Sequence, residues 1–449
     1  SFVQNSVDPR TGQYTLGIEL PELVGNDLSG PSLPLRLTYN PLNDQDSGFG
    51  VGWTLNLTQY VPSSNMLTLH TGERYKVMGS SSDYDIPERK LETFHFHVDD
   101  AERFRVVHKS GLVEFLETQG PQSDRVALPV RVEAASGHAI TLVHRQNVHA
   151  QNAPCLSEIH QTGAPLLKLT YESSRVLIDL HPESGPNGTP LARYELKLSR
   201  RGSPARRCVD AVVLPTDDQA SWRFNYRERR GLMLLSEVAT PAGAVETIAY
   251  NDDGHCFPGS GQLPEPLPRV TRHVIDPGAG QPRMITNYEY TSNNFLGHGS
   301  GIDWKDDGED HLYDSTNQNF TYGSTAYHRV VKVVDDKEVE QTVRTITRTF
   351  NRFHLMSKQV SEQDGHIQET ETLYHEEPEV NFARQPNNFQ LPYAVTQRWK
   401  LQNKLREQVL ITKYDEHGNL TLKSETAVPR YDTQGKLLEA QTLASAMYR

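Results

Sequence analysis

Alternation between apolar and polar residues recurs along almost the whole chain, and this feature most constrains its fold. Segments rich in Val, Thr, Ile and Tyr include Leu35–Tyr39, Thr54–Tyr60 and Met66–His70. A period of two is typical of β-strands, whereas an amphipathic helix needs a period near 3.6, and convincing segments of that kind are scarce. The sequence therefore predicts an all-β fold.

Glycine separates many of these segments. Hairpin turns demand backbone with positive φ, which glycine adopts without steric cost. The expected turns lie at Gly111, Gly137, Gly231, Gly243, Gly254, Gly365, Gly418 and Gly435. We therefore expect degenerate hairpin repeats that form a long strip of antiparallel hairpins.

Two of the expected strands carry polar residues on both faces. In Thr342–Phe350 the face that holds Val343 is rich in Thr, and the other face holds Arg344 and Arg348; Gln368–Tyr374 alternates Glu with Thr. A strand that packs on a dry core should show one apolar face. An edge strand of a sandwich explains one such segment, whereas a curved sheet around a wide cavity explains the series.

Composition and charge narrow the class of protein. Apolar residues, counted with Gly and without Tyr, make up about 39% of the 449 residues, below the roughly 45–50% of an ordinary globular chain. This shortage favours a thin wall over a thick core. The net charge of −12 opposes nucleic acid as a general partner, because phosphate binding needs a basic surface.

Cysteine use and hydropathy give little indication of the compartment. The three cysteines, Cys155, Cys208 and Cys256, form no CxxC pair, so no disulfide framework is expected. No apolar run approaches the roughly 18 residues of a membrane span, and the first thirty residues lack a signal-peptide pattern. The chain begins without Met and within patterned sequence, so we expect it to be a piece of a longer protein.

The familiar motifs of catalysis and cofactor binding are absent from the sequence. Gly48–Gly52 is not a dinucleotide loop, since Trp53 stands at the third glycine position and a strand pattern follows. No Gly-x-Ser-x-Gly elbow occurs. We predict no catalytic residues and no cofactor.

Two patterns resemble parts of metal sites. His95 and His97 share one face of an expected strand, which can begin a zinc site, but no third ligand is evident. Asp303 and Asp307 lie at calcium-loop spacing, although Lys305 stands where an oxygen ligand is needed. Wet surface histidines and a solvated loop are the competing interpretations, and we predict no metal.

The stretch from Arg193 to Arg230 holds ten basic residues and five acidic ones, opposite in sign to the whole chain. Binding of an anionic cargo is one interpretation. A solvated face that pairs with acidic residues elsewhere is the commoner one.

Two segments near the end carry a resemblance to a known family. Tyr414-Asp415-Glu416-His417-Gly418-Asn419-Leu420 and Tyr431-Asp432-Thr433-Gln434-Gly435-Lys436-Leu437 resemble the Tyr-Asp (YD) repeat of the Rhs family, and the segment that ends at Gly254 is similar to a weaker copy. The N-terminal block, which includes Gly50, Gly52 and Trp53, resembles the opening of a bacterial Rhs-repeat shell.

This resemblance implies a β-sheet strip that winds into a hollow shell around a C-terminal toxin domain. Such shells belong to type VI secretion effectors or to Tc insecticidal toxins, and they are secreted from the bacterial cytoplasm. The implied partners are the remaining C-terminal part of the shell, the enclosed toxin, and a secretion spike or chaperone, with no membrane partner. The family's self-cleavage core has no counterpart in this sequence, so no enzymatic activity is expected.

The domain organisation follows from these patterns. We expect an N-terminal β region that opens the shell at 1–100, Gly-turn hairpin repeats at 101–255, a Gly/Pro-rich linker at 256–268, and a repeat strip at 269–449 with an acidic loop at 293–325.

Two other functions stay open at this stage. An extracellular carbohydrate-binding or adhesion module, of the kind found in the related teneurins, would use Trp53 or Trp304. A hydrolase or protease would use His95, His97 or the Asp276-Pro277 bond.

Overall fold

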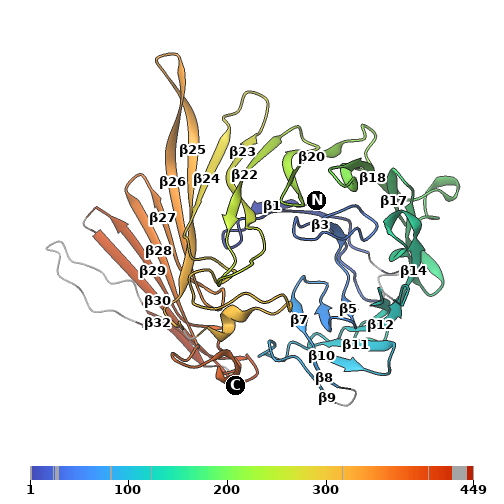
Figure 1. Cartoon of the computed structure of the whole chain (residues 1–449), viewed down its shortest axis with the longest axis horizontal. Coiled ribbons are helices and arrows are strands. Elements are labelled where there is room, and N and C mark those ends of the chain that lie inside the picture. Colours follow the sequence, from blue (N-terminus) through green and yellow to red (C-terminus); the bar gives the residue numbers. More distant parts are fainter. Residues whose placement is uncertain are drawn as a thin grey trace. The chain divides into compact units, whose positions relative to one another are not determined.

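The computed structural model describes residues 3–23, 25, 30–80, 83–122, 124–315, 317–402, 404–426 and 442–447. Nearly all regular structure in these residues is antiparallel β-strand, with four short 3-10 helices and no α-helix (Figure 1). The prediction of an all-β fold built from antiparallel hairpins is confirmed. In the described part of the chain, no helix is long and apolar enough to span a membrane.

The chain divides into two compact units. Unit 1 comprises Ser1–Val7 and Tyr14–Val245, and unit 2 comprises Asp8–Gln13 and Glu246–Arg449. The backbone therefore passes between the units three times, because residues 8–13 belong to unit 2 while both flanking segments belong to unit 1.

Unit 1 begins with a small antiparallel sheet. Its strands pair in chain order and are β1 (Val3–Val7), β2 (Tyr14–Glu19), β3 (Arg36–Tyr39) and β4 (Trp53–Leu55). Five short strands follow: β5 (Gln59–Val61), β6 (Met66–Thr68), β7 (Arg74–Lys76), β8 (Met78–Ser80) and β9 (Asp83–Asp85).

The rest of unit 1 is one ladder in which each strand pairs with the next. Its strands are β10 (Phe94–Val98), β11 (Arg103–His108), β12 (Val113–Gln119), β13 (Val126–Glu133), β14 (Ala139–Asn147), β15 (Ala153–Gln161), β16 (Ala164–Tyr171), β17 (Arg175–Leu180), β18 (Ala192–Arg201), β19 (Arg206–Val213), β20 (Ser221–Arg229) and β21 (Leu232–Ala239). The 3-10 helices η2 (Val148–Ala150) and η3 (Pro186–Gly188) lie between strands.

Unit 1 has a dry core on one face of its ladder. Val176, Ile178 and Leu180 of β17 are almost fully buried, and so are Leu16 and Ile18 of the small sheet. The low apolar content of the whole chain led us to expect a thin wall throughout, and this expectation is wrong for unit 1. The small sheet supplies a second apolar layer, so apolar residues in alternating positions suffice to build a conventional core.

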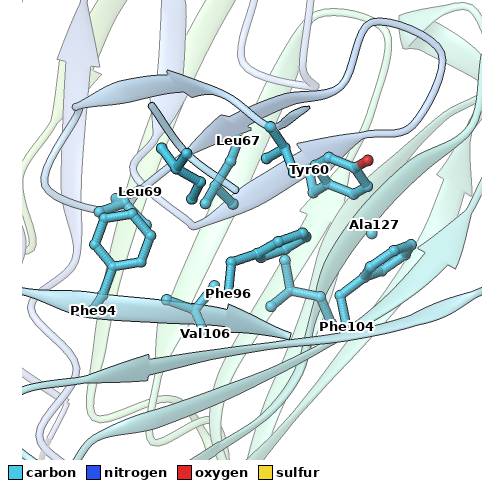
Figure 2. Close-up of a cluster of buried hydrophobic side chains, with 11 residues drawn as sticks. Tyr60, Leu67, Leu69, Phe94, Phe96, Phe104, Val106 and Ala127 are labelled. Carbon is cyan, nitrogen blue, oxygen red and sulfur yellow. The ribbon is translucent and has the colours of Figure 1, made fainter. Parts of the chain in front are cut away.

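A second core cluster lies where β5–β7 pack on β10–β13. Figure 2 shows Tyr60 and Leu67 in one layer, above Phe96 and Phe104 on the strands below. The ring centroids of Tyr60 and Phe104 are 4.8 Å apart, in an edge-to-face arrangement. Such aromatic pairs stabilise a core by about 0.5–1.5 kcal/mol beyond the area that they bury.

Unit 2 is also built from antiparallel strands that pair in chain order (Figure 1). Its strands are β22 (Val245–His255, of which Val245 belongs to unit 1), β23 (Leu267–Asp276), β24 (Met284–Tyr290), β25 (Thr321–Val334), β26 (Lys337–Asn351), β27 (Met356–Gln363), β28 (His366–Tyr374), β29 (Pro392–Leu401), β30 (Lys404–Tyr414), β31 (Leu420–Thr426) and β32 (Thr442–Met447). The 3-10 helices η4 (His311–Asp314) and η5 (Phe382–Arg384) lie in its loops.

The long strands of unit 2 have no dry face. In β26, Arg344 is exposed, Arg348 and the opposite Thr face are half-buried, and only Ile346 and Phe350 are buried. The largest fully buried side chains of unit 2 are Phe320, Phe353 and Phe389. All three lie in the loops that connect strands. The prediction that these strands are polar on both faces is confirmed.

Most of the predicted glycine turns are present. Gly111, Gly137, Gly231, Gly243, Gly365 and Gly418 all have positive φ between strands. Gly435 lies outside the described residues. The prediction of a turn at Gly254 is wrong, because β22 runs through this position to His255. A Cβ on Gly254 would lie 2.1 Å from the carbonyl oxygen of Leu267, so glycine there permits close approach of two strands rather than a turn.

The predicted boundary segments fall within unit 2. Residues 256–266 connect β22 to β23, so the predicted linker 256–268 extends two residues into β23. The acidic segment 293–325 contains η4 and the beginning of β25.

Candidate functional site

The Tyr-Asp motif at 414–420 forms the turn between β30 and β31. The Asp415 carboxylate accepts hydrogen bonds from the backbone N–H groups of His417 (3.0 Å) and Asn419 (2.8 Å). Its second oxygen accepts the side-chain amide of Asn419 at 2.9 Å. These contacts, the side chain of Asn419 foremost, lower the pKa of Asp415. The side chains of Asp415 and Asn419 therefore both act on the turn itself.

The structure also explains the residue types at two further positions of the motif. Gly418 has a φ of +79°, and its N–H donates to the Asp415 carbonyl at 3.1 Å. The ring of Tyr414 lies edge-on to His375, with centroids 5.8 Å apart. The corresponding residues of the second copy, Tyr431, Asp432 and Gly435, lie outside the described residues.

The Gly-rich segment before β4 is a buried anchor within unit 1. The Asp46 carboxylate accepts the N–H groups of Gly48 and Gly50, each at 2.9 Å, and it pairs with Arg207 of β19 at 3.3 Å. The backbone carbonyl of Arg207 also accepts a hydrogen bond from the N–H of Val51 at 2.8 Å. Hydrogen bonds and an ion pair therefore fix this segment against β19.

At Gly50 and Gly52, both the positive φ and the close approach of neighbouring atoms require glycine. Gly50 and Gly52 have φ of +89° and +85°. A Cβ on Gly52 would lie 2.7 Å from the ring of Tyr39, and one on Gly50 would lie 3.1 Å from the Arg207 carbonyl.

Trp53 completes the anchor. Its side chain is fully buried, and its indole N–H donates to the hydroxyl of Tyr226 at 2.9 Å. That hydroxyl donates onward to the carbonyl of Val209 at 2.8 Å. Gly50, Gly52 and Trp53 therefore join the small sheet to β19 and β20, and Trp53 is not available to stack on a carbohydrate.

One face of the unit 2 ladder carries a network of ion pairs. Arg398 contacts Glu369 and Glu371 at 2.8 Å and Glu407 at 2.7 Å. Lys358 and Lys400 each approach Glu369 at 3.4 Å. Because three cations balance three anions, this stretch of the face is polar but nearly neutral.

The opposite face of this ladder is also polar, and there charged side chains contact neutral polar ones. Arg348 donates to Gln359 at 2.8 Å, and Arg344 donates to Ser361 at 2.9 Å. Register then places Gln359 opposite Thr370 on β28. Neither face offers the apolar surface that a packed layer would require.

His95 and His97 lie together on the exposed face of β10, with ring centroids 6.2 Å apart. Phe94 and Phe96 point to the other side, into the core. Burial, Arg105 and His95 lower the pKa of His97. Among the residues that the structure describes, this pair belongs to no group of three potential metal ligands.

In the acidic loop, Asp303 and Asp307, the two residues at calcium-loop spacing, have different neighbours. Asp307 lies with Glu309 and His311, and its carboxylate is 2.8 Å from the His311 ring. Asp303 lies instead against Gly259. Asp307 and Glu309 are exposed, and ion pairs and turn hydrogen bonds account for their positions.

Arginines of the basic stretch pair with acidic side chains. Arg193 contacts Asp179 and Arg201 contacts Asp210, both at 2.6 Å, while Arg206 contacts Glu228 at 3.0 Å. These contacts agree with the interpretation of a paired, solvated face.

A buried polar cluster in unit 1 was missed by the sequence analysis. It comprises Thr58, His70, His108 and Glu114. One carboxylate oxygen of Glu114, Oε1, lies 2.9 Å from the Thr58 hydroxyl, 3.2 Å from His70 Nδ1 and 2.6 Å from His108 Nε2. The three potential ligand atoms of His70, His108 and Glu114 lie within 4.8 Å of one another.

The electrostatics of this cluster favour an ionised carboxylate. Burial by itself would raise the pKa of Glu114, but hydrogen bonds from His108, His70 and Thr58 outweigh it and lower the pKa to about 2. The hydrogen bond to Glu114 raises the pKa of His70.

Local sequence gives little indication of this cluster, because its members come from separate elements. His108 ends β11 and Glu114 lies in β12, whereas Thr58 and His70 flank β5 and β6. The one available indication is polarity at core positions. His108 continues the alternation of Phe104 and Val106, and Glu114 continues that of Leu116.

Comparisons with known proteins find similarity among solved structures. No protein-family model matches the chain, and no curated protein matches it. Among solved structures, the chain is similar to the Tc holotoxin pore of Photorhabdus luminescens, in a form with a mutation in TccC3, at 11% sequence identity and a TM-score of 0.35. The similarity covers 97% of this chain and 29% of that chain, so this chain spans less than a third of the other's length.

Proposed function

We propose that this chain is part of the wall of an Rhs-type shell that encloses a C-terminal toxin domain for delivery. The observation that carries the proposal is the unit 2 ladder, whose long strands are polar and half-buried on both faces. A sheet that packs on a core buries one apolar face, whereas a sheet that separates two aqueous compartments does not need to.

The ion-pair network gives such a wall a polar surface that is nearly neutral in charge. Glu369 and Arg398 satisfy each other across β28 and β29, so the face offers hydrogen bonds with little net charge and few apolar side chains. A surface of that kind holds an enclosed polypeptide without binding it tightly, because apolar burial is the main source of non-specific adhesion.

The Tyr-Asp turn supports the same proposal from the sequence side. The Asp, Gly and Asn of the motif each have a role in closing a hairpin, so a repeat of this motif specifies a repeat of hairpins. The expected partners are the remaining C-terminal part of the shell, the enclosed toxin, and a secretion spike or chaperone. We expect delivery by a type VI or Tc-like route, and no enzymatic activity of this chain.

Small-angle scattering of the chain tests the proposal. A compact protein of 449 residues has a radius of gyration of about 22 Å. We expect a clearly larger value for the monomer, together with the circular dichroism of a folded β protein, which excludes unfolding as the cause. A folded monomer at about 22 Å contradicts the wall function.

Proteolysis of the polypeptide extended to its natural stop codon tests the enclosure itself. We expect the C-terminal segment to resist protease in native buffer and to become sensitive when denaturant opens the hairpins. A segment cleaved at the same rate under both conditions contradicts enclosure and favours an open binding module.

A further inference from the structure

The cluster of His70, His108 and Glu114 combines three features of a metal centre. Its ligand atoms are two imidazole nitrogens and one carboxylate oxygen, which is the donor set of many zinc sites with three protein ligands. They converge on one point from three separate places in the chain. Thr58, His70 and His108 all contact the same side-chain oxygen of Glu114, Oε1.

The scaffold holds these side chains firmly. Val106 and Glu114 are register partners on β11 and β12, so His108, two residues after Val106, lies beside Glu114 on the same face. His70 directly follows Leu69, which is buried in the aromatic cluster shown in Figure 2. The site therefore lies at the seam where β5–β7 pack on β10–β12.

We propose that His70, His108 and Glu114 bind a Zn²⁺ ion, through Nδ1, Nε2 and the carboxylate respectively, with water as the fourth ligand. The proposal does not rest on the encapsulation function.

The distances fit this assignment. Tetrahedral zinc with ligands at about 2.0–2.1 Å places its ligand atoms about 3.3 Å apart. His70 Nδ1 and Glu114 Oε1 already lie 3.2 Å apart, and His108 Nε2, at 2.6 Å, needs to withdraw by less than 1 Å.

Thr58 has the role of an outer partner. Its hydroxyl donates to Glu114 Oε1, and it accepts the backbone N–H of His70 at 3.0 Å. One fully buried side chain thus orients two of the three ligands, which is how outer-shell groups fix ligand geometry in metal sites.

The partial exposure of the two histidines allows an ion to reach the site from solvent. The side chain of Glu114 is 5% exposed, whereas those of His108 and His70 are 14% and 27% exposed. The ionised carboxylate supplies the negative charge at the buried end, and the imidazoles face solvent, where water completes the coordination. N and O donors in this ratio select zinc over calcium or magnesium, which prefer oxygen alone.

The alternative is a hydrogen-bond cluster that never binds metal. Isothermal titration of the full chain, stripped with chelator and titrated with Zn²⁺, separates the two. We expect one equivalent bound, and a rise in the melting temperature on saturation. Titration with Co²⁺ is expected to give the visible absorption of tetrahedral cobalt bound to nitrogen and oxygen.

Matched variants locate the site. His70→Gln is expected to abolish the tight equivalent, and Thr58→Val to weaken it by about 10–100-fold. The control is the double variant His95→Gln and His97→Gln, which removes two exposed imidazoles from the neighbouring strand and is expected to leave binding unchanged.

Three outcomes overturn the proposal: no stoichiometric binding by the wild type, binding that survives His70→Gln, or binding that disappears in the His95 and His97 control. His70 is the most exposed ligand, so its variant is the one best able to fold. The cobalt spectrum of the wild type keeps the proposal testable even if that variant does not fold.

Discussion

At the scale of single residues, glycine has three different uses in this fold. Gly137 has a φ of +85° with open space around its missing side chain. Gly52 has the same φ but lies against the ring of Tyr39, and Gly254 has no positive φ and lets two backbones approach. The sequence shows the same letter at all three positions, and only the surroundings distinguish them.

Gly52→Ala and Gly137→Ala separate the cost of φ from the cost of crowding. Both variants place a Cβ in the left-handed region, which costs roughly 1–2 kcal/mol. Gly52→Ala also forces the Tyr39 ring to move, and overpacking typically adds about 1–3 kcal/mol. We expect equilibrium urea unfolding to show a larger loss of free energy for Gly52→Ala, and equal losses would contradict the anchor.

His255 makes unit 2 sensitive to acid. Its side chain is 1% exposed and lies between the rings of Tyr290 and Phe295. Burial, with the charge of Arg269, lowers the pKa of His255 to about 3, whereas an unfolded histidine has a pKa near 6.5. Between these values the unfolded chain binds a proton that the folded chain does not, so stability falls as the pH drops below about 6.5.

His255→Phe is expected to remove this contribution, which amounts to as much as about 1.4 kcal/mol per pH unit. Urea unfolding at several pH values between 6.5 and 4.5 should give a shallower loss of stability in the variant. His417→Gln, at an exposed position, serves as the control and should keep the wild-type slope. Parallel slopes for wild type and His255→Phe would contradict this assignment.

At the scale of elements, the hairpin is the unit that sequence predicts well. Turn glycines and period-two alternation are local features, and turns such as those at Gly111 and Gly365 follow from them. The cluster around Glu114 depends on residues as far as 56 positions away, so local pattern could not reveal it. The predicted pair His95 and His97 has the right residue types but no third partner in the described residues.

Asp415→Ala tests whether the motif closes its turn. The variant removes the acceptor for the N–H groups of His417 and Asn419. We expect faster hydrogen exchange at these amides, confined to the β30–β31 turn. Glu416→Ala changes a neighbouring carboxylate that makes only a 3.6 Å contact with His417, and it should leave exchange unchanged. Equal protection in both variants would show that Gly418 alone sets the turn.

At the scale of the whole molecule, average composition concealed a difference between the two units. An apolar content of about 39% suggested one kind of wall throughout. Unit 1 instead has its apolar residues on one face, which the small sheet covers. Unit 2 buries its largest rings, such as Phe320 and Phe389, in the loops that connect its strands. A single percentage cannot distinguish these arrangements, because both use alternating strands.

The short excursion of residues 8–13 into unit 2 has a consequence for biosynthesis. Gln13 donates to the carbonyl of Pro268, Gly12 accepts from Val270, and Pro9 accepts from Ser324. Their partners are translated more than 250 residues after them. Residues 8–13 cannot form these contacts until their partners have been synthesised. A single protease nick between Val245 and Glu246 would leave two pieces that residues 8–13 still hold together.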